Sequence, residues 1–289
     1  MGRITQLEPG LKRLVAPNPS PMTERGTNTY ILGTGPILVI DPGPDDPAHL
    51  EAILAAVGDA PVRRILVTHT HLDHSALAPR LAARTGAPVA AFGDYRAGRS
   101  PAMEGLDGLD GGEGLDRDFV PDEVLADGAV LDAHPGRVEA MWTPGHLGNH
   151  LTFLWNGAAF CGDLVMGWAT SLVSPPDGDL TRFMTSCRAL AARAPRVLYP
   201  GHGAPVTAPA DRIAWLLAHR DTREAQILAA LNAGPLTPRE IAGRLYADVD
   251  PHLLPAAERN VLAHLIDLSA RDRVRSPTAP SSTAPYDLP

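Results

Sequence analysis

The chain has 289 residues, 44% of them hydrophobic, which allows one large domain with a small appendage and excludes global disorder. Its formal charge of −8, from 25 basic and 33 acidic residues, argues against a broadly basic nucleic-acid surface. Two cysteines, Cys161 and Cys187, are too few for a disulfide framework. The sequence contains no apolar stretch of the roughly 18 residues needed to span a bilayer and no signal-peptide core, so we expect a soluble cytoplasmic protein.

Short apolar runs and turn signals alternate along the first two thirds of the chain. Residues 30–32 and 37–40 flank Gly33-Thr34-Gly35-Pro36, a pattern typical of a β-hairpin. Helical spacing of apolar residues predicts helices over 47–57 and 75–84. Further strands are predicted over 65–67, 89–92, 138–142, 151–155, 158–160 and 197–199. This alternation of strands and helices indicates an α/β fold.

Residues 104–127 have a different composition from the sequence around them. They contain nine acidic residues, five glycines and a single base, Arg117. This segment therefore accounts for the whole net charge of −8, and we predict a solvated surface insertion or lid.

The last third of the chain has a helical pattern. A long helix is predicted from about residue 208 to Gly234-Pro235, and Thr237 is a predicted N-cap with Pro238 at the first helical position. Helices to about 245 and over 255–268 complete a winged-helix-like module with nine arginines and nine acids over 211–275. We therefore predict an α/β domain over 1–207, a helical domain over 208–275 and a disordered tail over 276–289.

The strongest chemical signal is a cluster of potential metal ligands directly after the predicted strand at 65–67. His69, His71, Asp73 and His74 lie within six residues. Imidazole nitrogens and carboxylate oxygens bind zinc and similar metals, and alternate residues of an extended segment share a face. Four potential ligands at this density are more than a folded core requires, so the cluster predicts a metal site.

Three further candidate ligands follow other predicted strands, each beside a glycine that allows close backbone approach. They are His146 after Gly145, Asp163 after Gly162, and His202 between Gly201 and Gly203. Each alone is a weak signal, because a turn or a helix cap has the same composition. The ordered set of all four segments is a strong one.

With these motifs the sequence resembles the metallo-β-lactamase superfamily, whose His-x-His-x-Asp-His motif is matched by the cluster at 69–74. The resemblance covers roughly residues 20–207 and implies an αββα sandwich with a dinuclear site at one edge. It implies one metal held by His69, His71 and His146, a second held by Asp73, His74 and His202, and Asp163 bridging them. The superfamily's Asp-x-Gly segment is matched by 41–43, so Asp41 is either a residue that orients a ligand or a simple turn former.

A dinuclear site of this kind generates its own nucleophile. Metal coordination lowers the pKa of water to roughly 7, so a bridging hydroxide can attack a carbonyl or phosphoryl centre. Asp73 would coordinate and steer this nucleophile, and is the predicted catalytic residue. We expect two divalent ions and favour zinc, although the His/Asp ligand set also suits iron or manganese.

The substrate has several candidates. The chain also resembles the lactamase-beta-like group, which includes endoribonucleases and has a C-terminal winged-helix-like domain. This resemblance implies cleavage of single-stranded RNA, but the balanced charge of the C-terminal module weakens that interpretation. A glyoxalase-II-like hydroxyacylglutathione thioesterase, acting on a small ester or thioester, uses the same ligands. An iron-dependent sulfur dioxygenase shares the scaffold. A non-catalytic nucleic-acid- or protein-binding module is disfavoured, because every ligand position is filled.

The other histidines have simpler interpretations. His150 follows His146 closely enough to approach the site, although a role at the start of a strand is favoured. His219 and Arg220 lie in the predicted long helix and are either a helix-surface pair, which is favoured, or a pair that leans toward the site. The histidines predicted to face solvent are His49, His134, His252 and His264.

Overall fold

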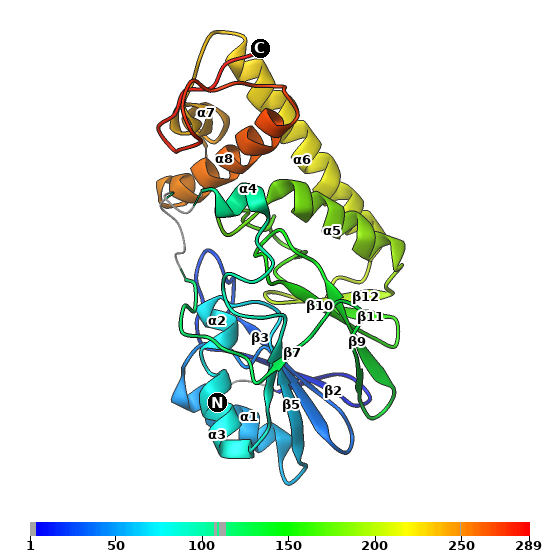
Figure 1. The fold of residues 1–289 in the computed structure, drawn as a ribbon. Helices are drawn as coiled ribbons and strands as arrows, with labels where there is room; N and C mark the ends of the chain where they lie inside the picture. Colours follow the sequence, from blue (N-terminus) through cyan, green and yellow to red (C-terminus); the bar gives the residue numbers. More distant parts are fainter. Residues whose placement is uncertain (1–3, 107–108, 110–113, 249) are drawn as a thin grey trace.

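The computed structural model describes residues 4–106, 109, 114–248 and 250–289, and Figure 1 shows its elements. Within these residues two sheets stack on each other. One has seven strands in sequence order: β1 Thr5–Glu8, β2 Leu11–Val15, β3 Asn28–Leu32, β4 Ile37–Ile40, β5 Val62–Leu66, β6 Val89–Ala91 and β7 Glu123–Val124. The other has five strands in the order β12 Val197–Pro200, β11 Ala158–Gly162, β10 Leu151–Trp155, β9 Arg137–Trp142 and β8 Val130–Asp132.

Helices cover both outer faces of this pair of sheets. The described helices are α1 Pro47–Val57, α2 Leu72–Ser75, α3 Ala78–Thr85, α4 Pro101–Glu104, α5 Leu180–Ala192, α6 Pro209–Leu231, α7 Pro238–Leu245, α8 Leu254–Ala270 and the 3-10 turn η1 Pro251–Leu253. Apolar residues of α1 and α3 pack on the seven-stranded sheet, and those of α5 and the start of α6 pack on the five-stranded one. A third cluster, with Tyr30, Phe153 and Phe160, fills the space between the sheets. The predicted αββα sandwich is therefore confirmed.

Both sheets present the ends of parallel strands at one edge of the sandwich. β4 pairs in parallel with β5, and β11 pairs in parallel with β12, so in each pair the carboxyl ends lie side by side. Two backbone hydrogen bonds join the sheets at this edge: Leu151 N–H donates to the Thr68 carbonyl at 2.7 Å, and Asn28 N–H to the Gly201 carbonyl at 2.7 Å. Residues that follow these strands therefore meet at a single place.

The C-terminal helices form a separate cluster above the sandwich in Figure 1. The predicted N-cap Thr237 is confirmed, because its hydroxyl accepts the Glu240 N–H while the Glu240 carboxylate accepts the Thr237 N–H at 2.8 Å. Asp267 of α8 accepts a hydrogen bond from Thr181 of α5 at 2.5 Å, which fastens this cluster to the sandwich. The domain boundary at 207/208 remains a prediction.

The predicted disordered tail over 276–289 does not match the structure. Tyr286 is fully buried, and its backbone exchanges two hydrogen bonds of 2.9 Å with Leu236. Asp287 likewise pairs with Arg275. The Ser/Thr/Pro-rich composition predicted disorder, but the apolar residues at its end pack into the helical cluster and anchor the segment.

The acidic segment 104–127 is not the wholly solvated insertion predicted from its composition. Its residues 107–108 and 110–113 lie outside the described part of the chain. In the described part, Leu115, Phe119 and Leu125 are buried, and Asp116 N–H donates to the Thr70 carbonyl at 2.8 Å. Apolar residues between the acids are thus buried, and the middle of this segment lies against the metal-ligand motif.

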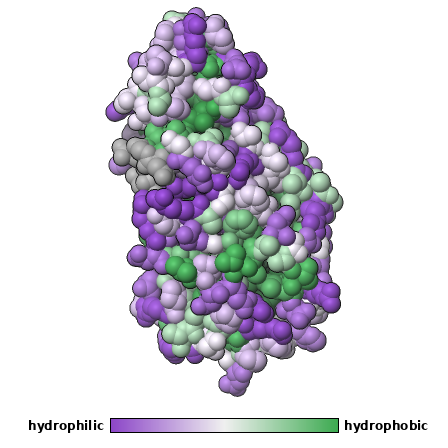
Figure 2. Space-filling model, viewed as in Figure 1, coloured by the Kyte–Doolittle hydropathy of each residue, from purple (hydrophilic) through white to green (hydrophobic). Residues whose placement is uncertain are grey.

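The surface has a mixed character. Figure 2 shows hydrophobic and hydrophilic patches on one face of the sandwich, and exposed apolar side chains include Val120, Val124 and Val130. Among the described helices, none combines the length and apolar character needed to cross a membrane.

Candidate metal centre

The predicted ligands come from the segments that follow four strands. His69 and His71 follow β5, and the short helix α2 after them carries Asp73 and His74. The remaining three follow strands of the other sheet: His146 after β9, Asp163 after β11 and His202 after β12. β9 runs in the same direction as β11, because both pair antiparallel with β10, and β12 is parallel to β11. The ends of these three strands and of β5 therefore bring all seven residues to the same edge.

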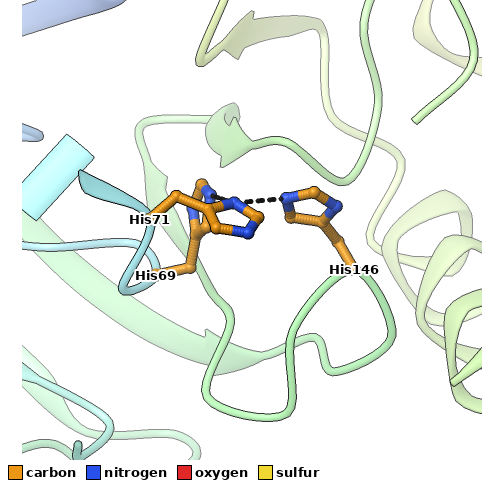
Figure 3. A group of neighbouring side chains, drawn as sticks. All are labelled: His69, His71 and His146. Atoms are coloured by element: carbon orange, nitrogen blue, oxygen red, sulfur yellow. Dashed lines mark hydrogen bonds between the residues drawn. The ribbon is translucent and has the colours of Figure 1, made fainter. Parts of the chain in front are cut away.

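Three imidazole rings form the first group, shown in Figure 3. His69 Nε2 lies 3.0 Å from His71 Nδ1, and His146 Nε2 lies 3.0 Å from the same atom. Ligands of a tetrahedral zinc ion, at about 2.0–2.1 Å from the metal, lie roughly 3.3 Å from each other. The spacing of these three nitrogens is therefore close to that of a metal-ligand set.

Hydrogen bonds at the other ring nitrogens fix the tautomers of two of these rings. His69 Nδ1 donates to Thr68 Oγ1 at 3.0 Å, because that hydroxyl gives its own proton to Asp41 at 2.8 Å. His146 Nδ1 donates to the Leu172 carbonyl at 2.7 Å. Each Nε2 then carries a lone pair directed at the centre of the group, as a metal ligand requires.

Asp73, His74 and His202 form the second group. His202 Nε2 lies 3.4 Å from both Asp73 Oδ2 and His74 Nε2, and the latter two atoms lie 3.5 Å apart. Asp73 is oriented by Thr27, whose hydroxyl donates to Oδ2 at 2.8 Å. His74 is oriented by the buried Asp41, whose Oδ2 accepts from Nδ1 at 3.0 Å.

Asp163 lies between the two groups. Its Oδ2 is 3.7 Å from His146 Nε2 in the first group and 3.3 Å from His202 Nε2 in the second. Its Oδ1 is 3.5 Å from His74 Nε2 and, although buried, accepts no hydrogen bond from the described residues. A buried carboxylate oxygen left in this state is costly unless a cation compensates it.

The two groups differ in their electrostatics. Burial and the neighbouring imidazole of His146 lower the pKa of His71 to about 3, so the first group is held neutral, the form that binds metal. Burial alone would lower the pKa of His74, but the carboxylates of Asp73, Asp163 and Asp41 raise it to about 10. The three carboxylates around His74 give this part of the site an excess of negative charge, which a divalent ion would neutralise. The residues therefore fit a two-metal site.

Asp41 accepts more hydrogen bonds than a simple turn former would need. Its φ is +50°, and its carboxylate accepts the Thr68 N–H at 2.7 Å and the Thr68 hydroxyl as well as His74. Thr68, Thr27 and Leu172, which orient the candidate ligands, were missed by sequence reasoning. Only the position of Thr68, beside the motif, offered a signal.

Several other histidine predictions are corrected by the structure. His49 and His264 were expected to face solvent, but both are buried. His49 lies on the packed face of α1, where Nε2 is 2.8 Å from the Thr29 hydroxyl. Arg220 is also buried rather than on a helix surface, and donates to Asn260 Oδ1 at 3.0 Å. His150 directly precedes β10 as expected, and its ring lies 5.2 Å from that of His69.

An αββα sandwich with a His/Asp centre at the end of its strands defines a class of metal-dependent hydrolases. The metallo-beta-lactamase superfamily model matches residues 22–202, and the chain belongs to that superfamily. A beta-lactamase-associated winged helix domain matches residues 237–279. The family and the winged-helix module expected from the motifs are both confirmed.

Known relatives match nearly the whole chain. A beta-lactamase-like protein 2 homolog of Drosophila melanogaster is 30% identical, over 94% of this chain and 92% of its own length. An atrochrysone carboxyl ACP thioesterase of Aspergillus fumigatus is 31% identical, over 93% of this chain and 84% of its own. A metallo-beta-lactamase family protein from Thermus thermophilus, whose crystal structure is known, is 26% identical in sequence. Its structure matches with a TM-score of 0.78, over 98% of this chain and 100% of its own.

Proposed function

We propose that the protein is a dinuclear metal-dependent hydrolase that cleaves a small thioester or ester. The observation that carries this proposal is the position of Asp163 between two groups of ligand atoms, each at metal-ligand spacing. His69, His71 and His146 would hold one ion, and Asp73, His74 and His202 the other, with Asp163 shared. Zinc is the expected metal, with iron or manganese as alternatives, because the ligand types suit all three.

Two bound divalent ions would supply Lewis acidity for the carbonyl and lower the pKa of water to roughly 7. The protein's own contribution is to orient the groups around that water. Asp73, half-buried and held by Thr27, would accept a proton from it. Asp41 orients His74, and through it the second group of ligands.

Two observations support a thioester substrate over RNA. A relative that matches 93% of the chain is named as a thioesterase. The reaction needs no basic groove, which agrees with the net charge of −8 and the balanced charge of the C-terminal module. Single-stranded RNA would require neutralised phosphates, and this charge distribution does not provide them.

A substrate panel tests the proposal. Metal-loaded protein would be assayed with S-lactoylglutathione, single-stranded RNA and a chromogenic lactam, and its metal content measured by emission spectroscopy. We expect thioester turnover that is lost, together with bound metal, in His71→Ala, while circular dichroism shows that the fold survives. Selective RNA cleavage would replace the proposal by the nuclease alternative, and iron content with oxygen uptake on a persulfide would replace it by the dioxygenase.

A further inference from the structure

A cavity of about 610 Å³ opens beside the first histidine group. His71 and His146 form part of its wall, so a molecule inside it would lie within reach of the candidate metal centre. This volume is in the range of pockets that bind small molecules, which is roughly 300–1,000 Å³.

The wall of the cavity comes from both domains. The sandwich contributes Met22, Leu147 and Leu172, and the C-terminal module contributes Leu253 and Ala256. Figure 1 shows α8 lying next to α5, and Ala263 of α8 packs in the cluster that covers the five-stranded sheet. The C-terminal module is therefore a structural part of this pocket rather than a separate appendage.

The charged side chains of the wall do not favour a polyanion. Apart from histidines, the ionisable residues that the structure describes in the wall are two acids, Asp177 and Glu258, and one base, Arg259. Asp177 forms an ion pair with Arg99, and Arg259 donates to the Ser174 hydroxyl at 2.9 Å. A phosphate backbone needs surplus positive charge, whereas the apolar part of this wall suits a hydrocarbon group.

Building on the proposed thioesterase function, we propose that this cavity binds an apolar acyl group of the substrate. Leu172 and Ala256, from opposite domains, would then set the length of acyl chain that fits. In the reaction, the oxygen of one water molecule bonds to the carbonyl carbon and the C–S bond breaks. The acyl group leaves as a carboxylate, one of the two protons of the water ends on the thiol, and the other is released to solvent.

A chain-length series tests the assignment. S-acyl N-acetylcysteamines from acetyl to octanoyl would be hydrolysed by the metal-loaded full chain, with thiol release measured by a chromogenic disulfide. Since burial of each methylene is favourable, kcat/KM should rise roughly two- to fourfold per methylene until the cavity is filled.

Two variants should move the preferred length in opposite directions. Ala256→Phe fills part of the cavity and should lower the octanoyl-to-acetyl ratio of kcat/KM at least tenfold. Leu172→Ala enlarges the cavity, keeps the carbonyl that binds His146, and should shift the preference to longer chains. Ala218→Phe, the same change as the first at an exposed position of α6, is the matched control and should keep the wild-type ratio.

The outcomes separate this inference from the function on which it rests. If metal-loaded wild-type protein hydrolyses no thioester of any length, the proposed function itself fails. If it hydrolyses all lengths equally, or if both cavity variants keep the wild-type ratio, the thioesterase function stands and the acyl site is wrong.

Discussion

The Nδ1 atom of His146 donates a hydrogen bond of 2.7 Å to the main-chain carbonyl of Leu172. The loop that carries Leu172 is held by the C-terminal module. The Oδ1 atom of Asn260 in α8 accepts the Val173 N–H at 3.1 Å and Arg220 Nη1 at 3.0 Å, and Arg220 also donates to the Ser171 carbonyl. A chain of hydrogen bonds therefore runs from α6 and α8 to a candidate metal ligand.

Asn260→Ala should weaken metal binding at the first group. Removing the side-chain acceptor frees the Val173 N–H and leaves Arg220 without one of its partners. The loop is then no longer held where the Leu172 carbonyl orients His146. Loss of such an orienting contact costs about 10- to 100-fold in metal affinity. Calorimetric titration with zinc should resolve one weakened and one normal site, and equal affinities in variant and wild type would contradict the expectation. Asn232→Ala, at an exposed position after α6, is the control.

Asp41→Asn should weaken the second group instead. An amide has one acceptor oxygen, whereas the Asp41 carboxylate accepts His74 Nδ1, the Thr68 N–H and the Thr68 hydroxyl. We expect a loss of about 10- to 100-fold in metal affinity at the second site, and a smaller loss at the first, because Asp41 also holds the Thr68 hydroxyl that orients His69. The same titration checks this, and the double variant with Asn260→Ala should weaken both sites. If Asp41 were only a turn former, both affinities would stay at the wild-type level.

Gly201→Ala should displace candidate ligands directly. A Cβ at this position would lie 2.3 Å from Asp163 Oδ1 and 2.6 Å from His74 Cε1, too close for either atom to stay in place. We expect at least a tenfold loss of metal affinity, measured by dialysis against a buffered zinc solution. Gly243→Ala in α7 meets no neighbouring atom, should keep full metal content, and should stabilise the helix by about 1 kcal/mol.

The candidate ligands could be predicted from sequence because they cluster after strands and their residue types are rare at such density. His69, His71 and His74 fall within one motif, and β9 and β12, which precede the distant His146 and His202, run in the same direction and end at the same edge. The orienting partners Thr27, Leu172 and Asn260 could not be predicted, since each belongs to a remote segment and is an ordinary residue in its own surroundings.

Elements with weak periodicity were also missed. No strand was predicted over Leu11–Val15, where Lys12 and Arg13 interrupt the apolar pattern, and no helix over Leu180–Ala192. His49 and His264 were assigned to the surface on polarity alone. Tertiary packing decided their burial, and no local pattern reports on it.

Burial of His264 should make the stability of the protein depend on pH. Both ring nitrogens lack a hydrogen-bond partner among the described residues, and burial, with the charges of Arg220 and Arg223, lowers the pKa of His264 to about 3. In the unfolded chain this pKa is about 6.5, so the unfolded state binds the extra proton and stability is lost as pH falls below 6.5 towards 3. From pH 7.5 to 5.5 this one group should cost about 1 kcal/mol of unfolding free energy.

Urea denaturation of wild type and His264→Leu at these two pH values, with saturating zinc, measures that contribution. Because leucine does not titrate, the variant should lose about 1 kcal/mol less than wild type between the two pH values. His252→Leu, at an exposed position before α8, should keep the wild-type difference. Equal losses in wild type and His264→Leu would mean that His264 is protonated in the folded protein, and that its burial does not exclude the charged form.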